Sequence, residues 1–251
     1  MSDKVFMEEM SWAEIKEAID QGKDTALVFV GAISQHGPHL PTGADTLIGY
    51  AWGELIARKL GNALVAPVIR PTYSDLHLGF PGTISLRLET VLNIIRDYCD
   101  SLAASGFKAI VLSLCFGSFT LIDAVAPSIA KSLKGVKIVT FTDIRGLVNK
   151  WFEIAGRYGI TPEEGGVHSG EAETSLLLAI RPDLVNRQAL EKGFVGDSVP
   201  LIPRLYIDGM KAHTQNGIIG DATKADVKRG EVYLQELTDY IAGEMRRSLA
   251  A

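Results

Sequence analysis

Short apolar runs alternate along the chain with longer stretches that have the spacing of amphipathic helices. The runs, each suited to a buried strand, cover residues 25–31, 64–69, 109–114 and 137–142. Because strands that alternate with helices are joined by crossovers, this order predicts an α/β fold with a mostly parallel sheet covered on both faces. Pro67 lies within its run, which favours a sheet edge or a strand end there.

The helical stretches carry recognisable start and stop signals. Ser11 and Glu14 form a capping-box pattern, and Gly61 is suited to end the second helix. We expect helices over residues 12–20, 45–60, 87–105, 120–133, 144–158, 169–180 and 223–249. Residues 184–206 have a less regular pattern. No repeat or linker interrupts residues 1–251, so we expect a single domain.

The composition argues against several classes of protein. Apolar residues make up 47% of the chain and charged residues 22%, as in an ordinary globular domain with a sizeable core. The net charge is −5 and no run of Lys or Arg forms a basic patch, so we expect no nucleic-acid partner. No apolar run reaches membrane-spanning length, and no signal peptide is expected at the acidic N-terminus. Because Cys99 and Cys115 form no disulfide framework, we expect a cytoplasmic protein.

Residues 31–45, with the sequence GAISQHGPHLPTGAD, form the most distinctive stretch. They leave the carboxyl end of a predicted strand, where open α/β sheets place their sites, and their prolines favour a rigid loop. His36 and Asp45 are a plausible pair of metal ligands. Simpler roles are also open, because Asp45 could cap the next helix and His36 could be a hydrogen-bonded turn histidine.

Two further segments hold reactive side chains near predicted strand ends. Cys115 and Ser118 follow the strand 109–114, and a later segment carries Glu163, Glu164, His168, Glu171 and Glu173. In a doubly wound sheet such loops can converge at one edge, where imidazoles, carboxylates and a thiol suit hydrolysis through an activated water. Plainer roles remain open, since a cysteine is often a small buried hydrophobe and glutamates suit a helix start.

Candidates for substrate contact come from the same loops and from residues 73–86. We expect such contacts from His39, Tyr73, His77 and Glu171. His77 and His213 are isolated histidines with no motif around them, so their assignment depends on where the loops meet.

These motifs together resemble those of the creatininase (creatinine amidohydrolase) family. The similarity covers residues 30–230 and rests on QHGPHLP with an aspartate four residues later, on FPGT, on HSGEAETSLLLAIRPDLV and on NGIIGDATKADVKRGE. The resemblance implies a three-layer αβα fold, commonly assembled as a hexamer, with one or two divalent metals, often zinc or manganese. Members of the family hydrolyse cyclic amides, formamides and related C–N or ring bonds.

The resemblance also assigns roles to residues of this chain. It implies that His36 is a metal ligand, that Asp45 is the bridging aspartate and that Glu173 lies near the metals. His168 matches the catalytic histidine of the family.

Three positions depart from the family pattern. Ser34 stands where the family has a glutamate ligand, and Cys115 stands where it has a histidine ligand. Ser118 replaces an asparagine. Serine is a poor zinc ligand, and cysteine is a good one only as the thiolate.

Three interpretations follow. In the first, which we favour, His36, Asp45 and Glu173 hold one divalent metal, zinc or manganese, rather than two or none. In the second, no metal binds and Cys115 is a nucleophile. In the third, the chain is a non-catalytic relative with a ligand pocket. We expect a hydrolase of a small cyclic amide, lactam, lactone or related ring other than creatinine, assembled as a homo-oligomer. The candidates for catalysis are His168, Cys115 and Ser34.

Overall fold

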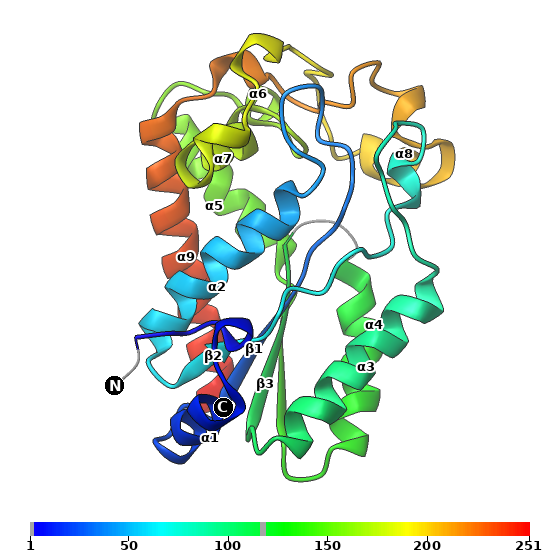
Figure 1. The fold of residues 1–251 in the computed structure, drawn as a ribbon. Helices are drawn as coiled ribbons and strands as arrows, with labels where there is room; N and C mark the ends of the chain where they lie inside the picture. The colour runs from blue at the N-terminus through cyan, green and yellow to red at the C-terminus, as the bar shows by residue number, and fades with distance from the viewer. Residues whose placement is uncertain (1–2, 116–118) are drawn as a thin grey trace.

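A sheet of parallel strands in the order β2–β1–β3–β4 lies at the centre of the molecule (Figure 1). The structure, a computed structural model, describes residues 3–115 and 119–251. The strands are β1 (Thr25–Val30), β2 (Ala63–Val65), β3 (Ala109–Leu114) and β4 (Lys137–Phe141). β1 and β3 pair along their whole length, from Thr25 opposite Ala109 to Val30 opposite Leu114. The predicted parallel α/β sheet is therefore confirmed.

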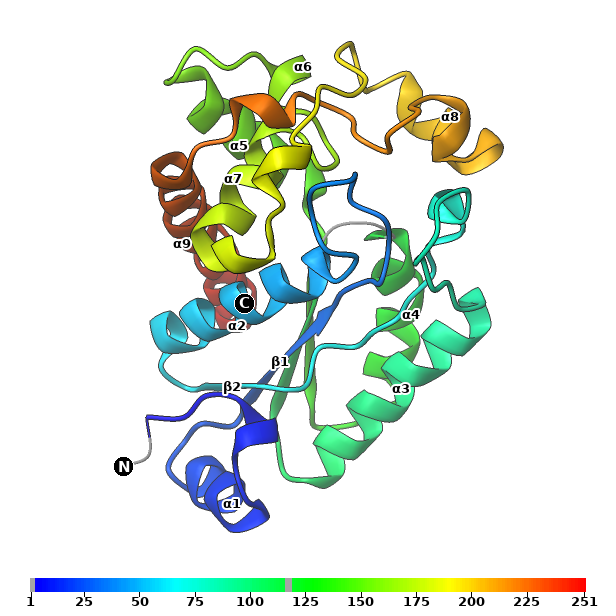
Figure 2. The ribbon, with the colours of Figure 1, turned by 45° about the horizontal axis from the view of Figure 1, so that its top comes forward.

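Helices cover both faces of the sheet, which confirms the three-layer αβα arrangement. They are α1 (Trp12–Asp20), α2 (Ala44–Leu60), α3 (Leu88–Ala104), α4 (Phe119–Ser132), α5 (Ile144–Gly156), α6 (Pro162–Gly165), α7 (Glu171–Ile180), α8 (Leu201–Asp208) and α9 (Val227–Ala250). α2, α5, α7 and α9 share one apolar core with Leu27 and Phe29 of β1. α1, α3 and α4 share the other with Ala26 and Val28 (Figures 1 and 2). Side chains of β1 alternate between the two faces of the sheet, and helices cover both faces, so every residue of β1 is buried.

The observed elements differ from the sequence-based boundaries in two informative places. β2 ends at Val65 at the sheet edge, and Pro67 follows it, as the proline predicted. The chain then runs beside β1 only as far as a bridge between Val30 and Ile69. α8 lies mostly in the segment that we expected to be irregular, because eight residues are too few to give a clear helical period.

None of the described helices, the 24-residue α9 included, is both long and apolar enough to cross a membrane.

The helix α9 packs closely on α7 through a glycine. A Cβ added at Gly230 would lie 1.9 Å from the main-chain oxygen of Ser175 in α7. The two backbones therefore approach more closely than any residue larger than glycine allows, and this contact fixes α7 against the core.

We predict that Gly230→Ala lowers the free energy of unfolding by about 2 kcal/mol, because overpacking of a rigid contact typically costs this much. Urea denaturation measures the change. Gly243→Ala in the same helix is the matched control, since the nearest atom to its added Cβ would be a flexible arginine nitrogen at 3.9 Å. The control is expected to gain up to about 1 kcal/mol from helix propensity. Equal effects at both positions would contradict the close contact.

Candidate active site

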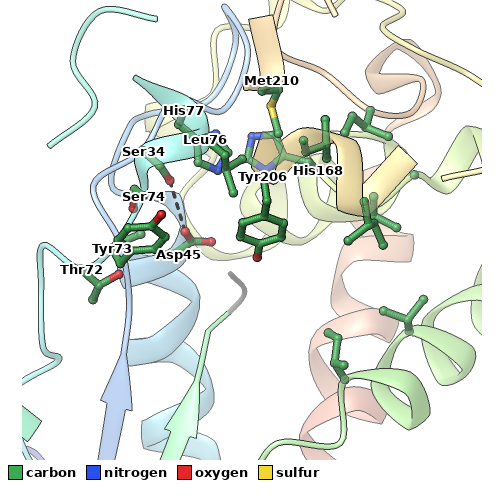
Figure 3. A pocket seen from close by; sticks show the side chains of 18 of the residues that line it. Ser34, Asp45, Thr72, Tyr73, Ser74, Leu76, His77, His168, Tyr206 and Met210 are labelled. Carbon is green, nitrogen blue, oxygen red and sulfur yellow. Dashed lines mark hydrogen bonds between the residues drawn. The ribbon is translucent and has the colours of Figure 1, made fainter. Parts of the chain in front are cut away.

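Side chains from four segments meet beyond the carboxyl ends of the strands (Figure 3). The segments are the β1–α2 loop, the first turn of α2, the short 3-10 helix η2 (Asp75–His77) and the stretch that leads into α7. They supply Ser34, His36, Asp45, His77, His168 and Glu173. Asp45 and Glu173 both lie in the first turn of a helix, where the backbone dipole favours a carboxylate.

The buried His36 lies between two carboxylates. Its Nε2 atom is 3.4 Å from Asp45 Oδ1 and 3.5 Å from Glu173 Oε1. Its Nδ1 atom lies 2.9 Å from the main-chain oxygen of Ser34, which requires a proton on Nδ1. In the neutral ring the lone pair is therefore on Nε2, directed toward both carboxylates.

His168 completes a cluster of potential ligands with His36 and Glu173. One ligand atom of each of these three residues lies within 4.8 Å of the others. The His36 and His168 rings are 4.4 Å apart between centroids. The resemblance implies a catalytic role for His168, so its position among possible ligands is an addition to the expected set. Ser169, with a φ of 55°, turns the chain between His168 and α7, and its amide donates to Glu173 Oε2 at 2.5 Å.

The donor atoms present fit a divalent metal. His36 Nε2 and Asp45 Oδ1 are buried without a hydrogen-bond partner, a cost that a proton or a metal ion between them would remove. Two ligands of a tetrahedral ion at about 2.1 Å each stand about 3.4 Å apart. The separations from His36 Nε2 to the two carboxylates match that value. Nitrogen together with carboxylate oxygen suits zinc or manganese.

The pKa values of the cluster follow from burial and from the shared charge. Burial opposes a proton on His36, but Asp45 and Glu173 outweigh it and raise its pKa well above the ordinary value. Burial alone would raise the pKa of Glu173, yet the charge of His36 lowers this pKa to about 2. Burial and the His36 charge lower the pKa of His77 to about 3 and hold that of His168 well below its ordinary range. The metal-free site therefore holds one cationic and two neutral imidazoles at neutral pH.

Gln35 connects the two neutral histidines and was not among the expected site residues. Its Nε2 atom lies 3.2 Å from His77 Nδ1, 3.1 Å from His168 Nε2 and 3.1 Å from the oxygen of Gly217, to which it donates. Gly217, with a φ of 79°, leaves room for this side chain, because a Cβ there would lie 2.0 Å from Gln35 Oε1. The only sequence signal was its place at the start of QHGPHLP.

The two departures from the family pattern that lie in the described chain have different surroundings. Ser34 Oγ lies 3.4 Å from Asp45 Oδ2, beside the cluster (Figure 3). Cys115 is fully buried, and its sulfur packs against Gly49, where a Cβ would come within 2.6 Å of it. Burial, with a smaller effect of Asp45, raises the pKa of this thiol well above its ordinary value of 9.0. Ser118 lies outside the described residues.

The expected substrate contacts divide into two groups. Tyr73 and His77 line a cavity beside the cluster, as does His168. His39 instead lies in the interior, with Nε2 2.8 Å from Thr174 Oγ1 and with its pKa lowered to about 4 chiefly by burial. His213 lies 3.1 Å from Asp208, at the end of α8.

Glu171 faces α9 rather than the cavity. It pairs with Arg229 and accepts hydrogen bonds from the Tyr233 hydroxyl and the Ser175 hydroxyl, each at 2.8 Å. This buried network joins α7 to α9 and gives Glu171 a structural environment.

The cavity beside the cluster has a volume of about 270 Å³. Ser34, Asp45, His77 and His168 form its polar end, and side chains of α5 and α8 form an apolar end (Figure 3). A small molecule in it would therefore have one end against the imidazoles and the carboxylate.

The family model described as creatinine amidohydrolase matches residues 8–244. The chain belongs to the creatininase family. It is 29% identical to the mycofactocin precursor peptide peptidase of Mycolicibacterium smegmatis over 88% of this chain and 84% of the relative. It is 27% identical to creatinine amidohydrolase of Pseudomonas putida over 98% of both. It is 24% identical to 3-dehydro-scyllo-inosose hydrolase of Thermotoga maritima over 94% of this chain and 81% of the relative.

Solved creatininase structures share the fold. One, of creatinine amidohydrolase (creatininase), aligns with a TM-score of 0.78 and 26% identity over 98% of both chains. Two further creatininase structures, one described as Zn-Zn type and one as Mn, align with a TM-score of 0.75 and 26% identity over 97–98% of this chain and 98% of each of theirs. The described fold of this family member is thus that of creatininase.

We predict that, in the metal-free protein, the His36 ring stays protonated at about pH 7 while the His77 ring stays neutral down to about pH 5. The reason is that the carboxylates raise the pKa of His36, whereas burial lowers that of His77 to about 3. Nitrogen NMR of the imidazoles measures both. Asp45→Asn removes one carboxylate and should lower the pKa of His36. A neutral His36 ring below about pH 6 would contradict this account.

Proposed function

We propose that the chain is a metal-dependent hydrolase that cleaves the C–N bond of a small cyclic amide or lactam, or opens a related ring such as a lactone. The observation that carries the proposal is the position of two carboxylates within 3.5 Å of Nε2 of a buried histidine. The relatives named above are hydrolases, and two of the similar structures are described with zinc or manganese. The substrate ring of this chain differs from creatinine in our proposal, because the ligand set differs.

The proposed ligands are His36, Asp45 and Glu173. His168 lies close enough to be a further ligand, but in this proposal it stays unbound and transfers protons. A divalent ion held there would supply a Lewis acid and lower the pKa of a bound water. We propose one ion per chain rather than two. Ser34 offers no carboxylate, and the raised pKa of Cys115 opposes a thiolate ligand.

The protein's own groups would handle the protons. Hydrolysis of an amide adds hydroxide to the carbonyl carbon and a proton to the nitrogen as the C–N bond breaks. His168 is neutral at pH 7 and lines the cavity, so it can accept the proton of the attacking water and return it to the leaving nitrogen. Gln35 would hold the His77 ring through its side-chain amide and the His168 ring through its main-chain oxygen, which lies 2.9 Å from His168 Nε2. The Ser34 hydroxyl beside Asp45 would orient that carboxylate.

The thiol alternative has less support. A nucleophilic cysteine needs a low pKa and access to the substrate, whereas burial raises the pKa of Cys115 and its sulfur faces α2. The cavity-lining residues also do not include it. A purely ligand-binding relative would not require a buried histidine between two carboxylates.

We predict that protein purified without chelator carries at most about one divalent ion per chain and that His36→Ala loses both ion and hydrolysis. Elemental analysis measures the ion. Cys115→Ala is the control, because it changes a buried residue that is not a proposed ligand. It should keep the ion and the activity.

Other outcomes would change the proposal in defined ways. Two ions per chain would show that the family's second site is intact despite Ser34. No ion, together with activity lost on alkylation of Cys115, would favour the thiol mechanism. No ion and no hydrolysis would favour a binding protein.

We also propose that the chain forms a homo-oligomer, a hexamer if it follows the assembly implied by the family resemblance. Exposed apolar side chains at and beside α8 support self-association, since Val199 is 74% exposed and Ile207 is 77% exposed. Light scattering is expected to give about six times the mass of one chain. A monomer mass at micromolar concentration would refute this proposal.

A further inference from the structure

The apolar end of the cavity comes from two helices that are distant in sequence. α5 presents one face, and the spacing of its cavity-lining residues by four, three and one positions is that of a helical stripe. These residues are Ile144, Val148, Trp151 and Phe152. α8 presents Ile202, Leu205 and Tyr206 from the other side. Figure 3 shows the Tyr206 ring on the cavity side of its helix, near His168. Aromatic and branched side chains of α5 and α8 thus form much of the cavity wall, beginning next to His168.

The cavity has no cation among the described residues that line it, apart from its histidines. Its carboxylate, Asp45, belongs to the proposed ligand set, and its other polar groups are hydroxyls such as those of Thr72, Tyr73 and Ser74. A substrate carboxylate or phosphate in this space would have no lysine or arginine to pair with. Burying such a charge against apolar walls is strongly unfavourable.

A second hollow lies against the β1–α2 loop, and charged side chains contribute to its lining. It has a volume of about 400 Å³ and is lined by Gln35, His36, Gly37, Phe80, Glu191 and Lys211, among others. Lys211 also lies over the Phe80 ring, at 4.4 Å from its centroid. A charged ligand would bind in this second hollow rather than in the cavity between α5 and α8. The two spaces therefore predict different substrates, one charged and one uncharged.

We propose that the substrate is a small uncharged amide whose apolar, ring-bearing group fills the space between α5 and α8, with its scissile bond toward His168 and Asp45. This inference rests on the proposed hydrolase function. The volume of the cavity, just below the range of ordinary ligand sites, suits one ring with a short substituent rather than an extended chain. The side chains that select the substrate are then those of α5 and α8.

The first test compares three hydantoins, which are cyclic amides that share one reactive ring. They carry no substituent, a 5-phenyl group or a 5-carboxymethyl group. Calorimetry on the zinc-loaded protein is expected to show that the phenyl compound binds at least about tenfold more tightly than either of the others. Equal binding, tighter binding of the carboxymethyl compound, or no binding of the phenyl compound would overturn the inference.

Binding and hydrolysis are measured separately, so that the two proposals fail in different ways. Tight binding of the phenyl compound without release of the ring-opened acid would support the apolar specificity and count against the hydrolase function. Hydrolysis of all three compounds at equal efficiency would support the function and overturn the specificity.

Variants of Val148 supply a matched pair. Val148 is half-buried on the α5 wall, so a longer side chain can be accommodated. Val148→Lys should weaken binding of the phenyl compound at least about tenfold and strengthen that of the carboxymethyl compound, since it adds the missing cation. Val148→Met, which has similar length and no charge, should weaken binding of the phenyl compound less than Val148→Lys does and should not strengthen binding of the carboxymethyl compound. Circular dichroism confirms that both variants fold.

Lys211→Ala tests the competing space. It should leave binding of the phenyl compound unchanged. If the carboxymethyl compound binds tightly to the unaltered protein and this binding is lost in Lys211→Ala, the substrate enters the second hollow and the inference is wrong.

Discussion

The burial of His36 between two carboxylates is the constraint on which the site depends. An isolated charge in this interior would be strongly unfavourable, and the three groups tolerate burial only because opposite charges, or a metal ion, compensate them. The arrangement requires three segments at once: the β1–α2 loop, the first turn of α2 and the first turn of α7. Each segment is in turn held by the sheet or by a close helix contact such as that at Gly230.

Most of the fold could be predicted because its signals are local. A strand buried on both faces must be apolar throughout, and β1 and β3 were recognised for that reason. Pro67 marked the end of β2 because a proline cannot donate to a sheet. α8 escaped prediction because a helix of two turns packs through too few residues to establish a period.

The site was harder to predict because sequence does not record which way a side chain points. Glu171 and Glu173 are two positions apart, so they lie about 200° apart around α7. Glu173 consequently reaches His36, whereas Glu171 reaches Arg229 and Tyr233 in α9. His39 shares a motif with His36, yet it packs on Thr174. Gln35 was not predicted because its amide neither ionises nor commonly binds a metal, although it contacts two histidines.

The reactive end of the cavity and its apolar end come from different parts of the chain. The β1–α2 loop, Asp45, His77 and His168 form the first, while α5 and α8 contribute most of the second. A substitution in α5 or α8 can thus alter which small molecule the cavity binds without disturbing His36 and its two carboxylates. The same division offers an engineer a set of side chains, those of α5 and α8, on which to diversify what the cavity binds.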